Sequence, residues 1–251
     1  MTETLVRTRG AVRPTRRLTW PAVLALHLLP AAATFAAAMA LEPAMRALSL
    51  PPQFALTLAF VFVLTPIELG LLLRAAHRVT GRWSLRALPA VLSFQRRLPL
   101  RLYCILLPSL TAIAVGVVIL LEPIQHAIGS VYPAGWLLPA DSEAFPAGTL
   151  VATLLVSLVV DGLINPAVEE LYFRAYLLPR LPVRGALAVL TSAGLFAAQH
   201  YWQPEQFVFV FVGQLVLIPV MLRLNSVRIS VATHCLTNSL AILVALAAVL
   251  F

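Results

Sequence analysis

Long apolar segments, separated by short polar stretches, follow one another along most of the chain. A helix of about 20 apolar residues is long enough to cross the hydrocarbon core of a bilayer. The pattern therefore predicts an all-α, polytopic integral membrane helix bundle with about 7–8 transmembrane helices. Its clear segments lie at about 21–41, 54–73, 102–121, 148–166, 185–199, 207–222 and 229–250, and the stretch 167–180 is mixed in character.

The composition agrees with a membrane protein. Of the 251 residues, 61% are hydrophobic and 11% are charged, and the mean hydropathy is +0.92. A soluble domain this apolar could not cover its own surface with polar groups. The composition therefore excludes an ordinary soluble enzyme, a disordered tail and a coiled coil. We divide the chain into a basic tail, 1–20, and one membrane domain, 21–251, whose first helix we expect to be retained rather than cleaved as a signal peptide.

All 18 basic residues are arginines, and they lie in clusters between the apolar segments. The net charge of +8 could suggest nucleic acid, but the clusters alternate with loops that carry little positive charge, as the positive-inside rule predicts. We therefore expect no nucleic-acid partner, a bacterial cell membrane, a cytoplasmic N-terminus and an outer C-terminus. This alternation requires 148–180 to form one crossing, kinked at Pro166.

Ionisable side chains inside apolar segments are costly and usually functional, and most of them lie in the C-terminal half. On a helix, Glu170 and Arg174 are four residues apart and can pair. Glu169 is then rotated by about 100° and stays free to act as a general base. Asp161 and Asn165 precede Glu169 at intervals of four and share its stripe.

Two further pairs have the same spacing of four residues, Phe196 with His200 and His234 with Asn238. Each group alone also fits a structural role, such as a salt bridge at a helix end, a helix cap or a polar contact between helices. Together, two histidines and a carboxylate can activate water. They do so either as acid and base or by holding zinc, and an asparagine can donate to an oxyanion.

Other polar groups fit structural roles better. We expect His27 to be a hydrogen-bonded histidine and Glu68 to pair with Arg74 or to extend toward the membrane surface. Cys104 and Cys235 have no CxxC partner and are expected to be small buried hydrophobic residues without a disulfide.

The motifs EExxxR (Glu169–Arg174), FxxxH (Phe196–His200) and HxxxN (His234–Asn238), in this order, resemble the CPBP (Abi) family, which includes the type II CAAX prenyl endopeptidase. The resemblance covers about residues 148–245. It implies an intramembrane endopeptidase that acts in the lipid bilayer on a membrane-associated protein or peptide.

The resemblance also implies roles for the six site residues. Glu169 would activate water with His200 beside it, and His234 and Asn238 would stabilise the oxyanion or complete a metal site. Glu170 and Arg174 would be the supporting pair. Both a metal-free glutamic mechanism and a Zn²⁺ site with Glu169, His200 and His234 as ligands remain open.

Two alternatives to an active protease follow from the sequence. One is a catalytically silent family member that acts as an immunity or binding protein. The other is a proton-coupled transporter, since intramembrane acids and histidines also build proton relays, although the internal repeat typical of transporters is not found.

The protease hypothesis carries a geometric condition. Counted from the cytoplasmic end of each helix, Glu169 lies about 18 Å deep, His200 about 24 Å and His234 only about 9 Å. These side chains can meet only if the helices tilt or if the last helix starts deep within the protein.

Overall fold

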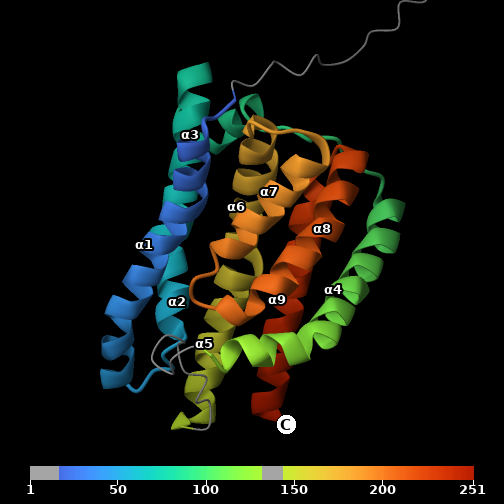
Figure 1. The fold of residues 1–251 in the computed structure, drawn as a ribbon. Helices are drawn as coiled ribbons and strands as arrows, with labels where there is room; N and C mark the ends of the chain where they lie inside the picture. Colours follow the sequence, from blue (N-terminus) through green and yellow to red (C-terminus); the bar gives the residue numbers. More distant parts are fainter. Residues whose placement is uncertain (1–16, 132–143) are drawn as a thin grey trace, which may run out of the picture.

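The computed structural model describes residues 17–131 and 144–251, and no β-strand occurs in them (Figure 1). The prediction of an all-α helix bundle is confirmed. The α-helices are α1 (Trp20–Ala47), α2 (Phe54–Ala59), α3 (Thr65–Thr80), α4 (Leu100–Gly129), α5 (Ala147–Val159), α6 (Asn165–Glu169), α7 (Gly185–Ala198), α8 (Phe207–Leu224) and α9 (Val227–Leu250). Between them lie the π-helical turns η1 (Phe60–Leu64), η4 (Val160–Ile164) and η5 (Glu170–Leu177), and the 3-10 turns η2 (Leu85–Ala90), η6 (Leu178–Arg180) and η7 (Pro204–Gln206).

Six helical segments of the described residues are long and apolar enough to cross a membrane. The segment Ala147–Arg180 is continuous over 34 residues, as the prediction of one crossing at 148–180 requires. Helix α7 is apolar but has only 14 residues. Six long segments and one short one agree roughly with the predicted number. The other five long segments are Trp20–Ala47, Phe54–Thr80, Leu100–Gly129, Pro204–Leu224 and Val227–Leu250.

Two of the π-helical turns stand just before a proline. Turn η1 precedes Pro66 and turn η4 precedes Pro166, each by two residues. A proline inside a helix lacks an N–H and its ring collides with the carbonyl four residues earlier, and a π-helical turn is one way to absorb this without ending the helix. The kink expected at Pro166 is therefore present as a wide turn in a continuous helix.

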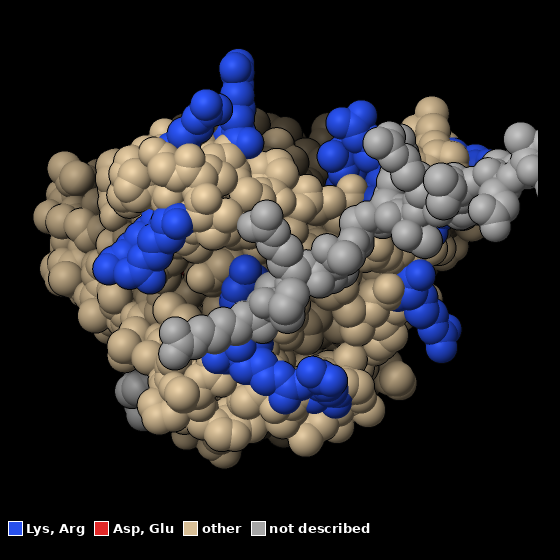
Figure 2. Space-filling model, turned by 90° about the horizontal axis from the view of Figure 1, so that it is seen from above, with Lys and Arg blue, Asp and Glu red and all other residues tan. Residues whose placement is uncertain are grey.

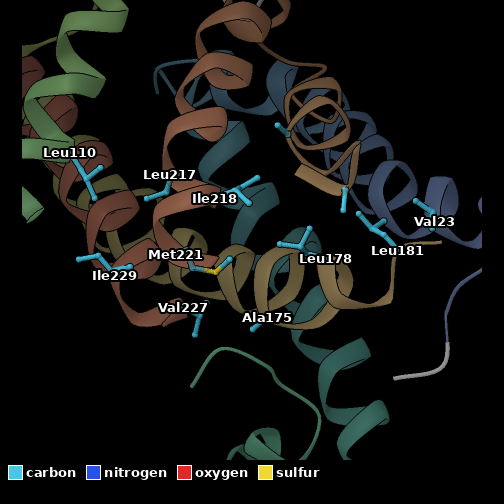
Figure 3. Close-up of a cluster of buried hydrophobic side chains, with 12 residues drawn as sticks. Val23, Leu110, Ala175, Leu178, Leu181, Leu217, Ile218, Met221, Val227 and Ile229 are labelled. Carbon is cyan, nitrogen blue, oxygen red and sulfur yellow. The ribbon is translucent and has the colours of Figure 1, made fainter. Parts of the chain in front are cut away.

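A hydrophobic cluster connects the helices of the C-terminal half with α1 and α4 (Figure 3). In it, Ile218 and Met221 of α8 and Ile229 of α9 are fully buried. They pack in one cluster with Ala175 and Leu178 of the long crossing. This packing holds the site-bearing helices α7, α9 and η5 in fixed relation.

The arginines gather at one end of the bundle (Figure 2). In the described part of the face seen there, arginine side chains are present and no acidic ones are visible. Of the predicted tail 1–20, residues 1–16 lie outside the described residues, as do 132–143 of the loop between α4 and α5. The exposed arginines of the described chain are Arg17, Arg46, Arg74, Arg78, Arg82, Arg86, Arg96, Arg97, Arg101, Arg184, Arg223 and Arg228.

The segment before α4 folds over the start of α9. The amide of Arg96 donates to the carbonyl of Asn225 at 3.0 Å, and the amide of Val227 donates to the carbonyl of Phe94 at 2.6 Å. Asn225 ends α8 in the left-handed conformation, with φ of 52°, which reverses the chain direction at once. Helix α9 therefore begins beneath this segment, inside the protein, with Ile229 fully buried.

The outer surface of the bundle is apolar. Large hydrophobic side chains are exposed along α4, among them Ile119 and Leu120, as expected for a helix that faces lipid. Cys104 is exposed on the same helix, so the prediction that it is buried was wrong. The reason is that the exterior of this protein is also apolar, so a hydrophobic side chain need not be buried. Cys104 and Cys235 are both free.

Gly162 is needed where η4 meets α9. A Cβ atom at this position would lie 2.9 Å from the Ser239 hydroxyl and 3.4 Å from the Ser239 Cα. We expect Gly162→Leu to destabilise the protein by about 1–3 kcal/mol through overpacking. Chemical unfolding in detergent micelles measures this loss. The control is Gly116→Leu on α4, where nothing lies within 4 Å of the added Cβ, and an equal effect of both changes would contradict the prediction.

Candidate active site

The centre of the candidate site is the Glu170 carboxylate, which is fully buried. Its Oε2 atom lies 3.6 Å from Nε of Arg174, as the spacing of four residues predicts. The same oxygen accepts a hydrogen bond from the hydroxyl of Ser230. Its Oε1 atom lies 3.0 Å from Nδ1 of His234. One carboxylate thus ties the π-helical turn η5 to the first two turns of α9.

Arg174 is also fully buried, and it continues the cluster toward α7. Its guanidinium lies over the ring of Phe196, 4.3 Å from the centroid, and an Nη1 hydrogen points to the Ser192 hydroxyl at 3.5 Å. Stacking on an aromatic face and pairing with a carboxylate are the two contacts that a guanidinium makes best in an apolar environment.

The two histidines lie on either side of Phe196. The ring centroid of Phe196 is 5.2 Å from that of His200 and 6.0 Å from that of His234. Nδ1 of His200 lies 2.8 Å from the carbonyl of Phe196, so its other ring nitrogen is not used in this bond. The ring of Trp202, 5.5 Å away, closes the other side of His200.

Glu169 is 3% exposed and lies next to this cluster. The side chain of Asn165 stands beside its carboxylate, and the charges of His234, Glu170 and Arg174 act on it. The ion pair of Arg174 is with Glu170. The carboxylate of Glu169 therefore stays outside this ion pair, as the helical spacing predicts.

Asn238 lies one turn beyond His234 on α9. Its Nδ2 atom donates to the backbone carbonyl of Asp161 at 3.1 Å, so one amide hydrogen is bonded and the second is not accounted for by this contact. The carboxylate of Asp161 is bonded elsewhere, to the hydroxyl of Thr57 at 2.6 Å. Asn238 therefore stands at the opposite end of the site from Arg174.

The three sequence motifs thus meet in one place, and the geometric condition is met. His234, two turns from Arg228, contacts Glu170, which itself lies only ten residues from Arg180. His27 is hydrogen-bonded as predicted, with Nδ1 2.7 Å from the carbonyl of Val23.

One expectation for this region was wrong. Glu68 neither pairs with Arg74 nor extends to the surface: it is fully buried, whereas Arg74 is exposed. The reason is that Glu68 lies on the face of α3 that packs against α6 and η5, while Arg74 lies on another face.

The sequence analysis missed the supporting side chains Ser192 and Ser230. The spacing of Ser230, four residues from His234 and eight from Asn238, would have placed it on the same face of α9.

The predicted zinc ligands were Glu169, His200 and His234. In the described residues, no group of three or more His, Cys, Asp or Glu side chains is arranged so that it could hold a metal ion. The Nδ1 atoms of His200 and His234 face protein acceptors, a contact that zinc-binding histidines also make. Zinc therefore stays a prediction, and no chemical step below depends on it.

Comparison with known proteins gives one match. Residues 151–240 match the family model described as type II CAAX prenyl endopeptidase Rce1-like, and all three motifs fall within this range. No curated protein and no solved structure matches the chain.

Removing the partner of the buried Glu170 carboxylate should be costly. We expect Arg174→Met to lower the free energy of unfolding by about 3–5 kcal/mol, because it leaves an uncompensated charge in an apolar interior. The control Arg78→Met, at an exposed position of α3, should change it by less than about 0.5 kcal/mol. Unfolding in detergent micelles compares the two, and similar small effects would show that the pair is not a structural requirement.

Proposed function

Residues 151–240 belong to the Rce1-like family of type II CAAX prenyl endopeptidases, and from this premise we propose that the chain is an intramembrane endopeptidase. Its substrate is a peptide bond of a membrane-associated protein or peptide. The observation that carries the proposal is the convergence of Glu169, His200 and His234, from three separate helical segments, around one buried ion pair. A structural salt bridge alone would not need two histidines beside it.

In the proposed reaction, Glu169 is the general base. It takes a proton from water, and the water oxygen forms a bond to the carbonyl carbon of the substrate. His200 lies beside the site: its Nδ1–H group donates to the carbonyl of Phe196, which leaves Nε2 as an acceptor. The tetrahedral intermediate then breaks at the C–N bond, and the proton held by Glu169 passes to the leaving amine.

His234 and Asn238 stabilise the oxyanion in this scheme. When His234 is an imidazolium, it donates from Nδ1 to Glu170 and from Nε2 to the oxyanion. Asn238 contributes the amide hydrogen that is not bonded to Asp161. Glu170, held by Arg174 and Ser230, orients His234 and compensates its charge. This explains why a second buried carboxylate follows Glu169 directly.

The site lies close to the arginine-rich end of the bundle. His234 is six residues from Arg228 and Arg174 is six residues from Arg180, so both are about 9 Å in from that end. We propose that this end faces the cytoplasm and that the cleaved bond lies near the corresponding membrane surface.

Replacement of the base tests the function. We expect Glu169→Gln to lower the cleavage rate by at least about a hundredfold, because an amide cannot accept the proton of water. Comparative proteomics of membrane-protein termini, in cells with the wild type or this variant, identifies the substrate and measures the loss. The control Glu122→Gln changes an exposed carboxylate of α4 and should leave the termini unchanged.

The same experiment separates the alternatives. If the wild type changes no terminus, the proposal of a protease fails and a silent binding protein gains support. If termini change but survive Glu169→Gln, the protease is real and the assigned base is wrong. Metal analysis of the purified protein, with a chelator in the cleavage assay, tests zinc independently.

The proposed orientation predicts a labelling pattern. In a background with Cys104→Ala and Cys235→Ala, we expect a membrane-impermeant thiol reagent added to intact cells to label Ser130→Cys but not Arg82→Cys. Arg82→Cys should react only after the membrane is permeabilised, because the arginine loop is cytoplasmic. The reverse pattern would invert the topology.

A further inference from the structure

Glu68 is a buried carboxyl group that the proposed mechanism leaves without a task. It has no exposed surface, and neither of its oxygens has a hydrogen-bond partner among the described residues. An isolated polar group in an apolar interior is costly, and nearly all buried polar groups in proteins are bonded to protein or to ordered water. A bound water molecule would supply the partner that the described residues do not.

The neighbours of Glu68 show where its side chain lies relative to the candidate site. Helix α3 packs on α6 and η5, and one turn before Glu68 the hydroxyl of Thr65 donates to Oδ1 of Asn165 at 3.3 Å. Asn165 is also the side chain beside Glu169. The charge of Glu169 acts on Glu68. Glu68 therefore lies near Glu169, on the side of α6 that packs against α3.

No hydrogen bond from a described residue reaches the carboxyl group of Glu68, and the ion pair of Arg174 is with Glu170. The phenol of Tyr172, which also lies near Glu68, donates to the carbonyl of Leu26 at 2.9 Å. A water molecule has two hydrogens, and it can donate one to each carboxyl group, which satisfies both.

We propose that Glu68 is a further catalytic residue, which holds the hydrolytic water together with Glu169. The inference rests on the proposed function. With one hydrogen directed to each carboxyl group, the water presents a lone pair in a fixed direction toward the substrate carbonyl. Glu169 removes the proton that it accepts, and Glu68 keeps the remaining hydroxyl oriented while the C–O bond forms. Such positioning contributes to the rate without contributing to substrate affinity.

Two substitutions of similar volume separate this role from packing. Glu68→Gln keeps an oxygen acceptor for the water, whereas Glu68→Leu removes it. We expect Glu68→Leu to lower kcat by about tenfold to a hundredfold with KM nearly unchanged, and Glu68→Gln to restore most of the loss. The control Glu122→Leu makes the same change at an exposed position of α4.

Unfolding midpoints of the same variants test whether Glu68 has a structural role instead. Leu in place of an unpartnered buried carboxyl group should leave the unfolding midpoint unchanged or raise it. A lowered midpoint for Glu68→Leu would make Glu68 a structural residue and overturn the proposal. Unchanged kcat in a folded Glu68→Leu variant, or an equal loss in both variants, would overturn it as well.

A third measurement does not depend on cleavage. Radiolytic hydroxyl-radical labelling marks side chains next to bound water, and Tyr172 has no exposed surface. We expect Tyr172 to be labelled in the wild type and in Glu68→Gln, and several times less in Glu68→Leu, while Tyr103 on α4 is labelled equally in all. An unlabelled Tyr172 in the wild type would exclude the water. If the wild type cleaves nothing but this labelling pattern holds, the proposed function fails and the water site stands.

Discussion

A carboxylate and a guanidinium without access to water, Glu170 and Arg174, can persist in this bundle only because several helices supply their partners. Ser230 and His234 come from α9, and Phe196 and Ser192 come from α7. The desolvation cost of such a pair is large and is offset only when each charge is well bonded. The requirement fixes the distance and rotation of α7 and α9 relative to η5. Since Glu169, His200 and Asn238 stand on these same elements, the ion pair also determines the geometry of the candidate site.

Wide helical turns make this arrangement possible. Residues 170–177 form a π-helical turn, in which the spacing of side chains around the axis differs from that of an α-helix. Glu169 and Glu170 stand at the boundary between α6 and this turn, so two adjacent carboxylates serve different neighbours. One lies beside Asn165 and α3, and the other beside Arg174 and α9. Turns of this kind are often found at functional sites of other proteins.

Much of this structure could be predicted from short-range spacing. The apolar segments gave the helices, the arginine clusters required 148–180 to be one crossing, and intervals of four residues paired Glu170 with Arg174. What the sequence could not supply are contacts between helices distant along the chain. Glu68 illustrates this, because its nearest arginine in sequence lies on another face of α3. The inward start of α9 depends on backbone bonds between 94–96 and 225–227, for which no local pattern exists.

The short length of α7 affects the position of helix α4, which contributes no residue to the candidate site. The fourteen residues of α7 extend over about 21 Å, which is less than the roughly 30 Å of a bilayer core. The irregular segment after α7 therefore lies within the depth of the bundle (Figure 1). Backbone amides and carbonyls there cannot face hydrocarbon. Helix α4 packs against η7 of this segment and separates it from lipid. An outward movement of α4 would expose these groups to the acyl chains, so this loop favours the packed position of α4 in addition to the contacts of α4 with α8 and α9.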